Sequence, residues 1–210
     1  MLNTLHIKAI SFDLDDTLWP VWPAIERAEA TLLQWLTDHA PATAARYPSS
    51  AALREVRGQV ESERPDLLHD LSALRRESIR LALHHAGDDP ALAEHAFEAF
   101  FAARQRVDFY PDAMSALTRL AARYPLVALT NGNADVHLVG IGHLFHAAIS
   151  AREFGFAKPD PRIFHAAALA AQVGPHEVLH VGDDPLMDVV GAVSAGMQSV
   201  WVNRAGHDWN

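Results

Sequence analysis

The sequence predicts a doubly wound α/β domain that is interrupted after its first strand by an all-helical insertion. Five short apolar runs, rich in Val, Ile and Leu, fit strands buried on both faces of a parallel sheet. Helical stretches separate the later runs, and such alternation of strand and helix is typical of doubly wound folds. The runs lie at residues 7–14, 125–130, 146–150, 177–181 and 198–202.

Two helices between the later strands carry recognisable start signals. Asp160 stands before Pro161, which matches an N-cap followed by proline in the first helical turn, and Gly174 marks the stop. A second Asp-Pro pair, at residues 184–185, predicts another helix start. These helices complete the strand–helix alternation.

The segment between the first and second apolar runs has a different pattern. No stretch within residues 21–107 predicts a strand, and apolar residues recur there at helical spacing. Asp66 and the pair Asp89–Pro90 are predicted helix starts. We therefore expect two domains, a core of residues 1–18 and 108–210 and a helical domain of residues 19–107.

Composition and charge favour a soluble protein that binds neither nucleic acid nor membranes. The 210 residues carry a formal net charge of -9, whereas nucleic-acid binding needs clustered basic surface. No apolar run is long enough for a membrane span, and the first residues do not resemble a signal peptide. The absence of cysteine excludes disulfides and thiol chemistry. We expect a cytoplasmic protein that is a monomer or a dimer.

Chemically active side chains follow the apolar runs at their carboxyl ends, where open parallel sheets bind ligands. These side chains are Asp13, Asp15 and Thr17 after the first run, Thr130 and Asn131 after the second, and Asp183, Asp184 and Asp188 after the fourth. Lys158, which Pro159 would hold extended, lies between the third and fourth runs. We expect all of these groups to converge on one crevice.

So many carboxylates close together require a compensating positive charge. A hard divalent cation supplies it, and oxygen ligands suit magnesium, which prefers a substrate phosphate in its shell. Lys158, with hydroxyl and amide donors, suits a phosphoryl group. Asp13 would be the nucleophile, giving an aspartyl-phosphate. Asp15, on the same side of an extended backbone, could protonate the leaving oxygen and then deprotonate water.

Four motifs resemble, in order and spacing, those of the haloacid dehalogenase superfamily: "DLDDT", "LTNG", "KPDP" and "GDDPLMD". The resemblance covers the whole predicted core and implies a Rossmann-like sheet with a mobile helical cap. It implies that Asp13 is the nucleophile, that Asp15 is the general acid and base, and that Thr130 and Lys158 are catalytic phosphate ligands. We also expect Asn131 to contact the phosphate.

The same resemblance implies a magnesium site. The expected ligands are Asp13, the backbone carbonyl of Asp15, and Asp183. Asp188 is a supporting acid, and either Asp184 or Asp188 completes the metal shell. A structural role remains open for both residues. Asp184 precedes Pro185 and could be a helix N-cap, and Asp188 could instead stabilise the helix dipole as an acid in the first turn.

An aspartate at position 15 favours the phosphatase branch, because the family's dehalogenases lack an acid two residues after the nucleophile. The segments "LTNGNAD" and "LHVGDDPLMDVVGAVSAGMQ" also resemble a bacterial subgroup active on flavin mononucleotide (FMN) and similar sugar-phosphate or nucleotide monoesters. The predicted function is therefore that of a magnesium-dependent phosphatase acting on a small phosphorylated metabolite.

Three alternatives share parts of this pattern. A phosphomutase would have the same core residues and would transfer the phosphoryl group to a second sugar hydroxyl. A non-catalytic protein that binds phosphorylated metabolites and a 2-haloacid dehalogenase rank lower. Asp16 is expected to shape the turn only, and Trp19 and Trp22 either pack in the core or hinge or line the substrate pocket.

Overall fold

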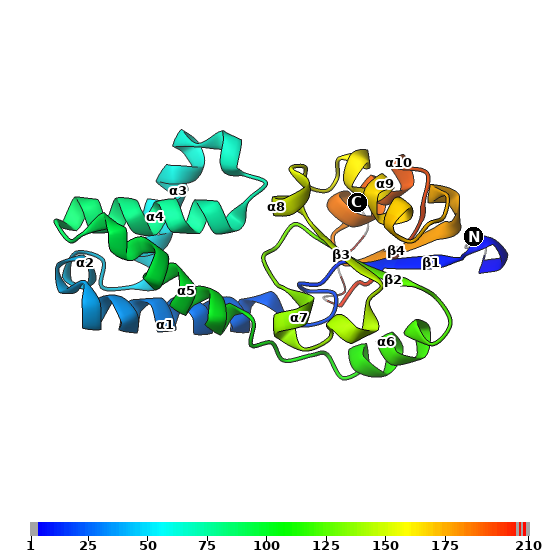
Figure 1. Ribbon diagram of the computed structural model, residues 1–210, viewed down its shortest axis with the longest axis horizontal. Coiled ribbons are helices and arrows are strands. Elements are labelled where there is room, and N and C mark those ends of the chain that lie inside the picture. Colours follow the sequence, from blue (N-terminus) through cyan, green and yellow to red (C-terminus); the bar gives the residue numbers. More distant parts are fainter. Residues whose placement is uncertain (1–3, 205, 207, 209–210) are drawn as a thin grey trace. The chain divides into compact units, whose positions relative to one another are not determined.

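The computed structural model describes residues 4–204, 206 and 208, and the chain divides into two compact units (Figure 1). The first unit combines Met1–Pro20 with Asp108–Asn210, and the second is Val21–Val107. Trp19 and Pro20, which the sequence analysis assigns to the helical domain, belong to the first unit. The reason is local, since Trp19 forms a parallel β-bridge with Asp15.

A five-stranded parallel sheet forms the centre of the first unit, which confirms the predicted α/β fold. The strand order is β3-β2-β1-β4-β5, so the chain moves outward on one side of β1 and then returns to build the other side. The carboxyl end of β1, the central strand, therefore lies at a topological switch point, where ligands bind in such folds. The strands are β1 (Ala9–Phe12), β2 (Leu126–Thr130), β3 (Ala147–Ser150), β4 (Val178–Gly182) and β5 (Gln198–Trp201).

Helices cover both faces of this sheet, with α9 and α10 on one side and α6 on the other (Figure 1). All residues of β1 and β2 are buried, as expected for strands covered on both faces. Phe164 of α9 is fully buried in the core between helix and sheet. The helices are α6 (Ala113–Ala121), α7 (Val136–Val139), α8 (Ala151–Phe154), α9 (Pro161–Ala170), the π-helix η6 (Pro185–Val190) and α10 (Gly191–Ser194).

The predicted helix starts at the Asp-Pro pairs 160–161 and 184–185 are confirmed as helix N-caps. The Asp160 side chain accepts a hydrogen bond from the backbone of Arg162 at the start of α9. Asp184 caps η6 in the same way, through the backbone N–H groups of Leu186 and Met187. These caps satisfy donors that the first turn of a helix leaves without partners.

The second unit is helical, and residues 21–107, all of which the structure describes, contain no strand. One expected helix start is wrong: Asp70, not Asp66, caps α4. Asp66 lies in a 3₁₀ turn and pairs instead with Arg64. The helices are α1 (Val21–His39), α2 (Pro41–Arg46), α3 (Ser50–Glu63), α4 (Leu71–Ala86) and α5 (Ala93–Arg104). Short 3₁₀ turns along the chain are Thr4–His6, Pro65–Leu67, Pro90–Leu92, Gly142–Leu144 and Pro175–Glu177.

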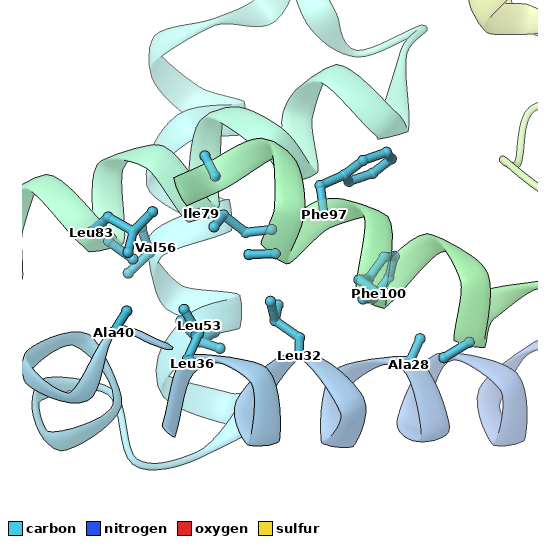
Figure 2. Close-up of a cluster of buried hydrophobic side chains, with 14 residues drawn as sticks. Ala28, Leu32, Leu36, Ala40, Leu53, Val56, Ile79, Leu83, Phe97 and Phe100 are labelled. Carbon is cyan, nitrogen blue, oxygen red and sulfur yellow. The ribbon is translucent and has the colours of Figure 1, made fainter. Parts of the chain in front are cut away.

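A separate hydrophobic core holds this helical unit together. Side chains from α1, α3, α4 and α5 meet in one cluster that includes Leu32, Leu36, Ile79 and Phe100 (Figure 2). Each of these four is at least 98% buried. Across the described part of the chain, no helix is both long and apolar enough to cross a bilayer.

Replacing Leu32 by alanine should lower the free energy of unfolding by about 2–5 kcal/mol, because it leaves a cavity among well-packed helices. Leu68 is 55% exposed in the same unit. Its replacement by alanine should change the free energy by no more than about 0.5 kcal/mol. Urea denaturation followed by circular dichroism checks both values, and equal effects of the two changes would contradict this description of the core.

Candidate active site

The first unit has a pocket of about 170 Å³ at the carboxyl ends of β1, β2 and β4. Every candidate site residue that the sequence analysis places in the catalytic or metal-binding set lines this pocket. Its lining consists of Asp13, Asp15, Thr130, Asn131, Gly132, Lys158, Asp183, Asp184, Met187 and Asp188. The expected convergence on one crevice is thus present for these residues. Thr17, which was also expected there, does not line the pocket and donates a hydrogen bond to Asp183 instead.

A tight turn after β1 orients the first two acids. Asp13 continues the strand pairing, since its backbone N–H donates to Val181 of β4. Asp16 then adopts a left-handed conformation with φ of 57°, which aspartate tolerates better than most residues. Its N–H donates to the carbonyl of Trp19, and the indole Nε1 of Trp19 donates to Asp15 Oδ1 at 2.8 Å. The turn therefore directs Asp13 and Asp15 into different surroundings.

Lys158 lies at the centre of the site and is almost fully buried. Its ammonium donates to Asp13 Oδ1 at 2.5 Å and to Asp188 Oδ1 at 2.6 Å. The side-chain amide of Asn131 holds the Lys158 backbone at both ends, donating to its carbonyl and accepting from its N–H. Asn131 thus positions Lys158, and its side chain is already engaged.

Three donors hold the buried carboxylate of Asp188. Besides Lys158, His180 Nε2 lies 3.1 Å from Oδ1, and the backbone N–H of Asp184 donates to Oδ2 at 3.0 Å. Gly182 makes room for this arrangement, because a Cβ there would lie 2.2 Å from Asp188 Cγ. Asp188 therefore has a fixed place beside Lys158.

Sequence reasoning missed two buried polar residues behind the site. The Ser11 hydroxyl lies 2.8 Å from Nδ1 of His180, and both side chains are fully buried inside the sheet. His180 in turn contacts Asp188, so a hydrogen-bonded chain runs from β1 through β4 to the site. The available signal was a polar residue within each of two apolar strands, in "AISF" and "VLHV".

Thr130 and Gly132 form the wall of the pocket at the end of β2. Thr130 is buried, and its hydroxyl accepts a hydrogen bond from the Gly132 backbone at 2.8 Å. A Cβ on Gly132 would lie 2.4 Å from Oδ2 of Asp15. The close approach of this loop to Asp15 therefore requires glycine.

Three carboxylates are placed where they could share a cation. One oxygen each from Asp13, Asp183 and Asp188 lies within 4.8 Å of the others. Thr17 holds Asp183 by donating to its Oδ1 at 2.9 Å. All of the donors are hard oxygen atoms, which is the set that magnesium prefers. The side chain of Asp184 is outside this group and caps η6.

The electrostatics of these acids differ. Burial raises the pKa of Asp13 to about 8, against the opposing charge of Lys158 and with the help of the Asp188 carboxylate. Burial also raises the pKa of Asp183 to about 6. Although burial opposes it, the hydrogen bond from His180 and the charge of Lys158 hold the pKa of Asp188 well below its usual range.

The two basic groups beside these acids also differ in charge. Burial would lower the pKa of Lys158, but the neighbouring carboxylates of Asp13 and Asp188 raise it, so this lysine stays charged. Burial lowers the pKa of His180, which is therefore neutral near pH 7. One ammonium thus faces more carboxyl groups than it can compensate, and the site favours a further cation.

Comparison with known families identifies the chain. Residues 7–196 match the model of the haloacid dehalogenase-like hydrolases. The chain belongs to this family. The match spans most of the chain and includes all four motifs.

Several curated relatives are phosphatases, and two of them illustrate the similarity. The chain is 36% identical to 5-amino-6-(5-phospho-D-ribitylamino)uracil phosphatase YigB of Escherichia coli over 97% of its length and 86% of the relative. It is 43% identical to a phosphoserine phosphatase of Thermus thermophilus, over 62% of this chain and 55% of that protein. These relatives support the predicted class of phosphoric monoester hydrolases.

A solved structure of high similarity carries a different activity in its name. It is the 2-haloacid dehalogenase of Pseudomonas syringae pv. tomato, with a TM-score of 0.88 and 40% sequence identity. The alignment covers 97% of this chain and 90% of that protein. The family and the Rossmann-like fold are therefore confirmed, and both phosphatases and dehalogenases are among the similar proteins.

Binding of a divalent cation should release protons, because it favours the ionised forms of Asp13 and Asp183. At pH 7 a carboxyl with the pKa of Asp13, about 8, is mostly protonated, whereas that of Asp183, about 6, is mostly ionised. We expect release of about one proton per cation at pH 7, more at pH 6 and almost none at pH 9.5. Calorimetry in buffers of different ionisation enthalpy measures this number, and binding without proton uptake by the buffer at pH 7 would contradict it.

Proposed function

We propose that the protein is a magnesium-dependent phosphatase that hydrolyses a small phosphomonoester through an aspartyl-phosphate. The observation that carries the proposal is the pair Asp13 and Asp15 in one pocket with Lys158. Asp13 contacts the ammonium, and Asp15 contacts an indole N–H instead. Two acids in different surroundings suit two different roles, nucleophile and proton donor.

The reaction follows from these positions. A carboxylate oxygen of Asp13 attacks phosphorus, the bond from phosphorus to the ester oxygen breaks, and Asp15 gives its proton to that oxygen. Asp15, now ionised, takes a proton from water as the water oxygen attacks the aspartyl-phosphate. Inorganic phosphate leaves and Asp13 is restored. Lys158 and Thr130 are the proposed donors to the phosphoryl oxygens, and the Asn131 side chain keeps Lys158 in place.

Asp13 and Asp183 are the proposed magnesium ligands, together with the backbone carbonyl of Asp15, and Asp188 supports them. A bound cation would compensate the excess of negative charge and stabilise the phosphoryl oxygens. We assign Asp184 to capping η6 rather than to the metal, because both of its backbone partners belong to that helix.

The substrate class that we propose is a small metabolite with a phosphorylated sugar or sugar-alcohol chain. The name of the E. coli relative describes a substrate with a phosphorylated ribityl chain. FMN, which the motif resemblance suggests as a substrate, also ends in a ribityl phosphate. Both therefore belong in one assay panel, with sugar phosphates and nucleoside monophosphates.

A second candidate is 2-haloacid dehalogenase activity, which the similar Pseudomonas structure favours by its name. Asp15 argues against it. Dehalogenation proceeds without a proton donor to a leaving oxygen, whereas hydrolysis of an unactivated phosphomonoester needs one.

Asp13→Asn should abolish turnover, with at least a thousandfold loss of kcat, because the amide cannot form the acyl-phosphate. Asp16→Asn is the matched control, since asparagine also tolerates the left-handed conformation at this turn. This variant should keep activity close to that of the wild type. Phosphate release from p-nitrophenyl phosphate measures both, and near-normal turnover by Asp13→Asn would refute the mechanism.

The wild-type protein with magnesium should release phosphate from aryl and sugar phosphates and no halide from 2-chloropropionate. A chelator should stop phosphate release, and added magnesium should restore it. Halide release without phosphate release would favour the dehalogenase. Full activity in chelator would remove the cation from the proposal, and transfer of phosphate to a second sugar hydroxyl would indicate a mutase.

A further inference from the structure

Trp19 is the one tryptophan of the first unit that contacts a proposed proton-transfer group among the described residues. Its indole Nε1 donates to Asp15 Oδ1 at 2.8 Å, and the side chain is completely buried. It lies outside the four sequence motifs, two residues after the end of "DLDDT". We propose that Trp19 is a positioning residue that keeps the transferable proton of Asp15 on Oδ2.

The chemistry of the indole gives this contact its direction. An indole N–H can only donate, so its partner oxygen must accept in both protonation states of Asp15. Oδ1 therefore acts as the acceptor throughout, and this favours the proton of the neutral acid on Oδ2, because a carbonyl oxygen is a better acceptor than a hydroxyl oxygen. A residue that can both donate and accept, such as serine or tyrosine, would leave the choice of oxygen open.

Oδ2 lies on the side of the pocket where phosphate donors are expected. A Cβ built on Gly132 would lie 2.4 Å from Oδ2 and 3.1 Å from the Thr130 hydroxyl. Asp15 Oδ2 and Thr130 Oγ1 thus approach the same point at the end of β2. A proton on Oδ2 is close to the proposed phosphate-binding groups, whereas a proton on Oδ1 would face the buried indole.

The indole itself is fixed by its surroundings. Its ring packs edge-on against Phe109, with ring centroids 5.3 Å apart. The backbone of Trp19 is held by the bridge to Asp15 and by the hydrogen bond from Asp16. The turn that gives Asp16 its left-handed conformation therefore also brings the Trp19 side chain back to Asp15, and a rigid partner restricts the carboxyl more than a mobile one would.

This inference rests on the proposed function, because it assigns a role to the proton of Asp15. Trp19→Phe removes the N–H and keeps a ring against Phe109. For an alkyl phosphate, whose leaving oxygen needs a proton, kcat/KM should fall about tenfold. For p-nitrophenyl phosphate, whose leaving group departs as a stable anion, the loss should be less than about twofold.

The ratio of the two losses separates positioning from packing. A Trp19→Phe variant that loses the same factor on both substrates, or loses nothing on either, would overturn the inference. Trp35→Phe is the control, since Trp35 stacks on His39 in the helical unit. This variant should keep the kcat/KM of the wild type on both substrates. If wild-type activity requires Asp15 but the substrate ratio of Trp19→Phe is unchanged, only the inference fails, and the proposed function stands.

Nuclear magnetic resonance tests the contact without activity and without the Trp19→Phe variant. The sequence has five tryptophans, and the indole signal of Trp19 is identified by its contacts with Phe109. We expect the indole N–H proton of Trp19 to resonate downfield and to exchange slowly with solvent. In Asp15→Ala this signal should move upfield, while the indole signal of Trp35 should not change. An unchanged Trp19 signal in Asp15→Ala would overturn the inference even if the protein hydrolyses no phosphate ester.

Discussion

The organisation of the site depends on one buried ammonium group that two aspartate side chains share. Burying ions costs several kcal/mol each unless their partners are well placed, so Lys158, Asp13 and Asp188 constrain one another. They come from three segments that the sheet topology brings to the ends of β1 and β4. The close fit at Gly182 and the clamp by Asn131 are consequences of the same requirement.

Two aspartates only two residues apart obtain different chemistry from their neighbours. Asp13 contacts a charged ammonium and lies among other carboxyl groups, which raises its pKa when no cation compensates them. Asp15 contacts a neutral indole donor at the edge of the same pocket. The backbone alternation places both on one side, and the left-handed turn at Asp16 then separates their surroundings. The local geometry thus explains why two aspartates can have two different proposed roles.

Much of the fold was predictable because it depends on local chemistry. Short apolar runs indicated all five strands, although only β1 and β2 are buried at every residue and the edge strands β3 and β5 are partly exposed. The Asp-Pro pairs at residues 160–161 and 184–185 indicated two helix starts. Asp66 misled because a carboxylate near a helix can pair with a neighbouring arginine as well as cap the helix, and nothing local distinguishes the two. The candidate site residues were found because they follow strands whose carboxyl ends must meet.

The sequence by itself determined the alternation of strand and helix, the family motifs and the acids that gather at one sheet edge, because each depends on residue type and spacing. Only the tertiary structure decided which partners those acids have. His180 and Ser11 support Asp188 from inside the sheet, and Trp19 contacts Asp15, through pairings of hydrogen-bonding groups in three dimensions. Such pairings depend on register and on side-chain direction across neighbouring elements, which no local pattern of the chain encodes.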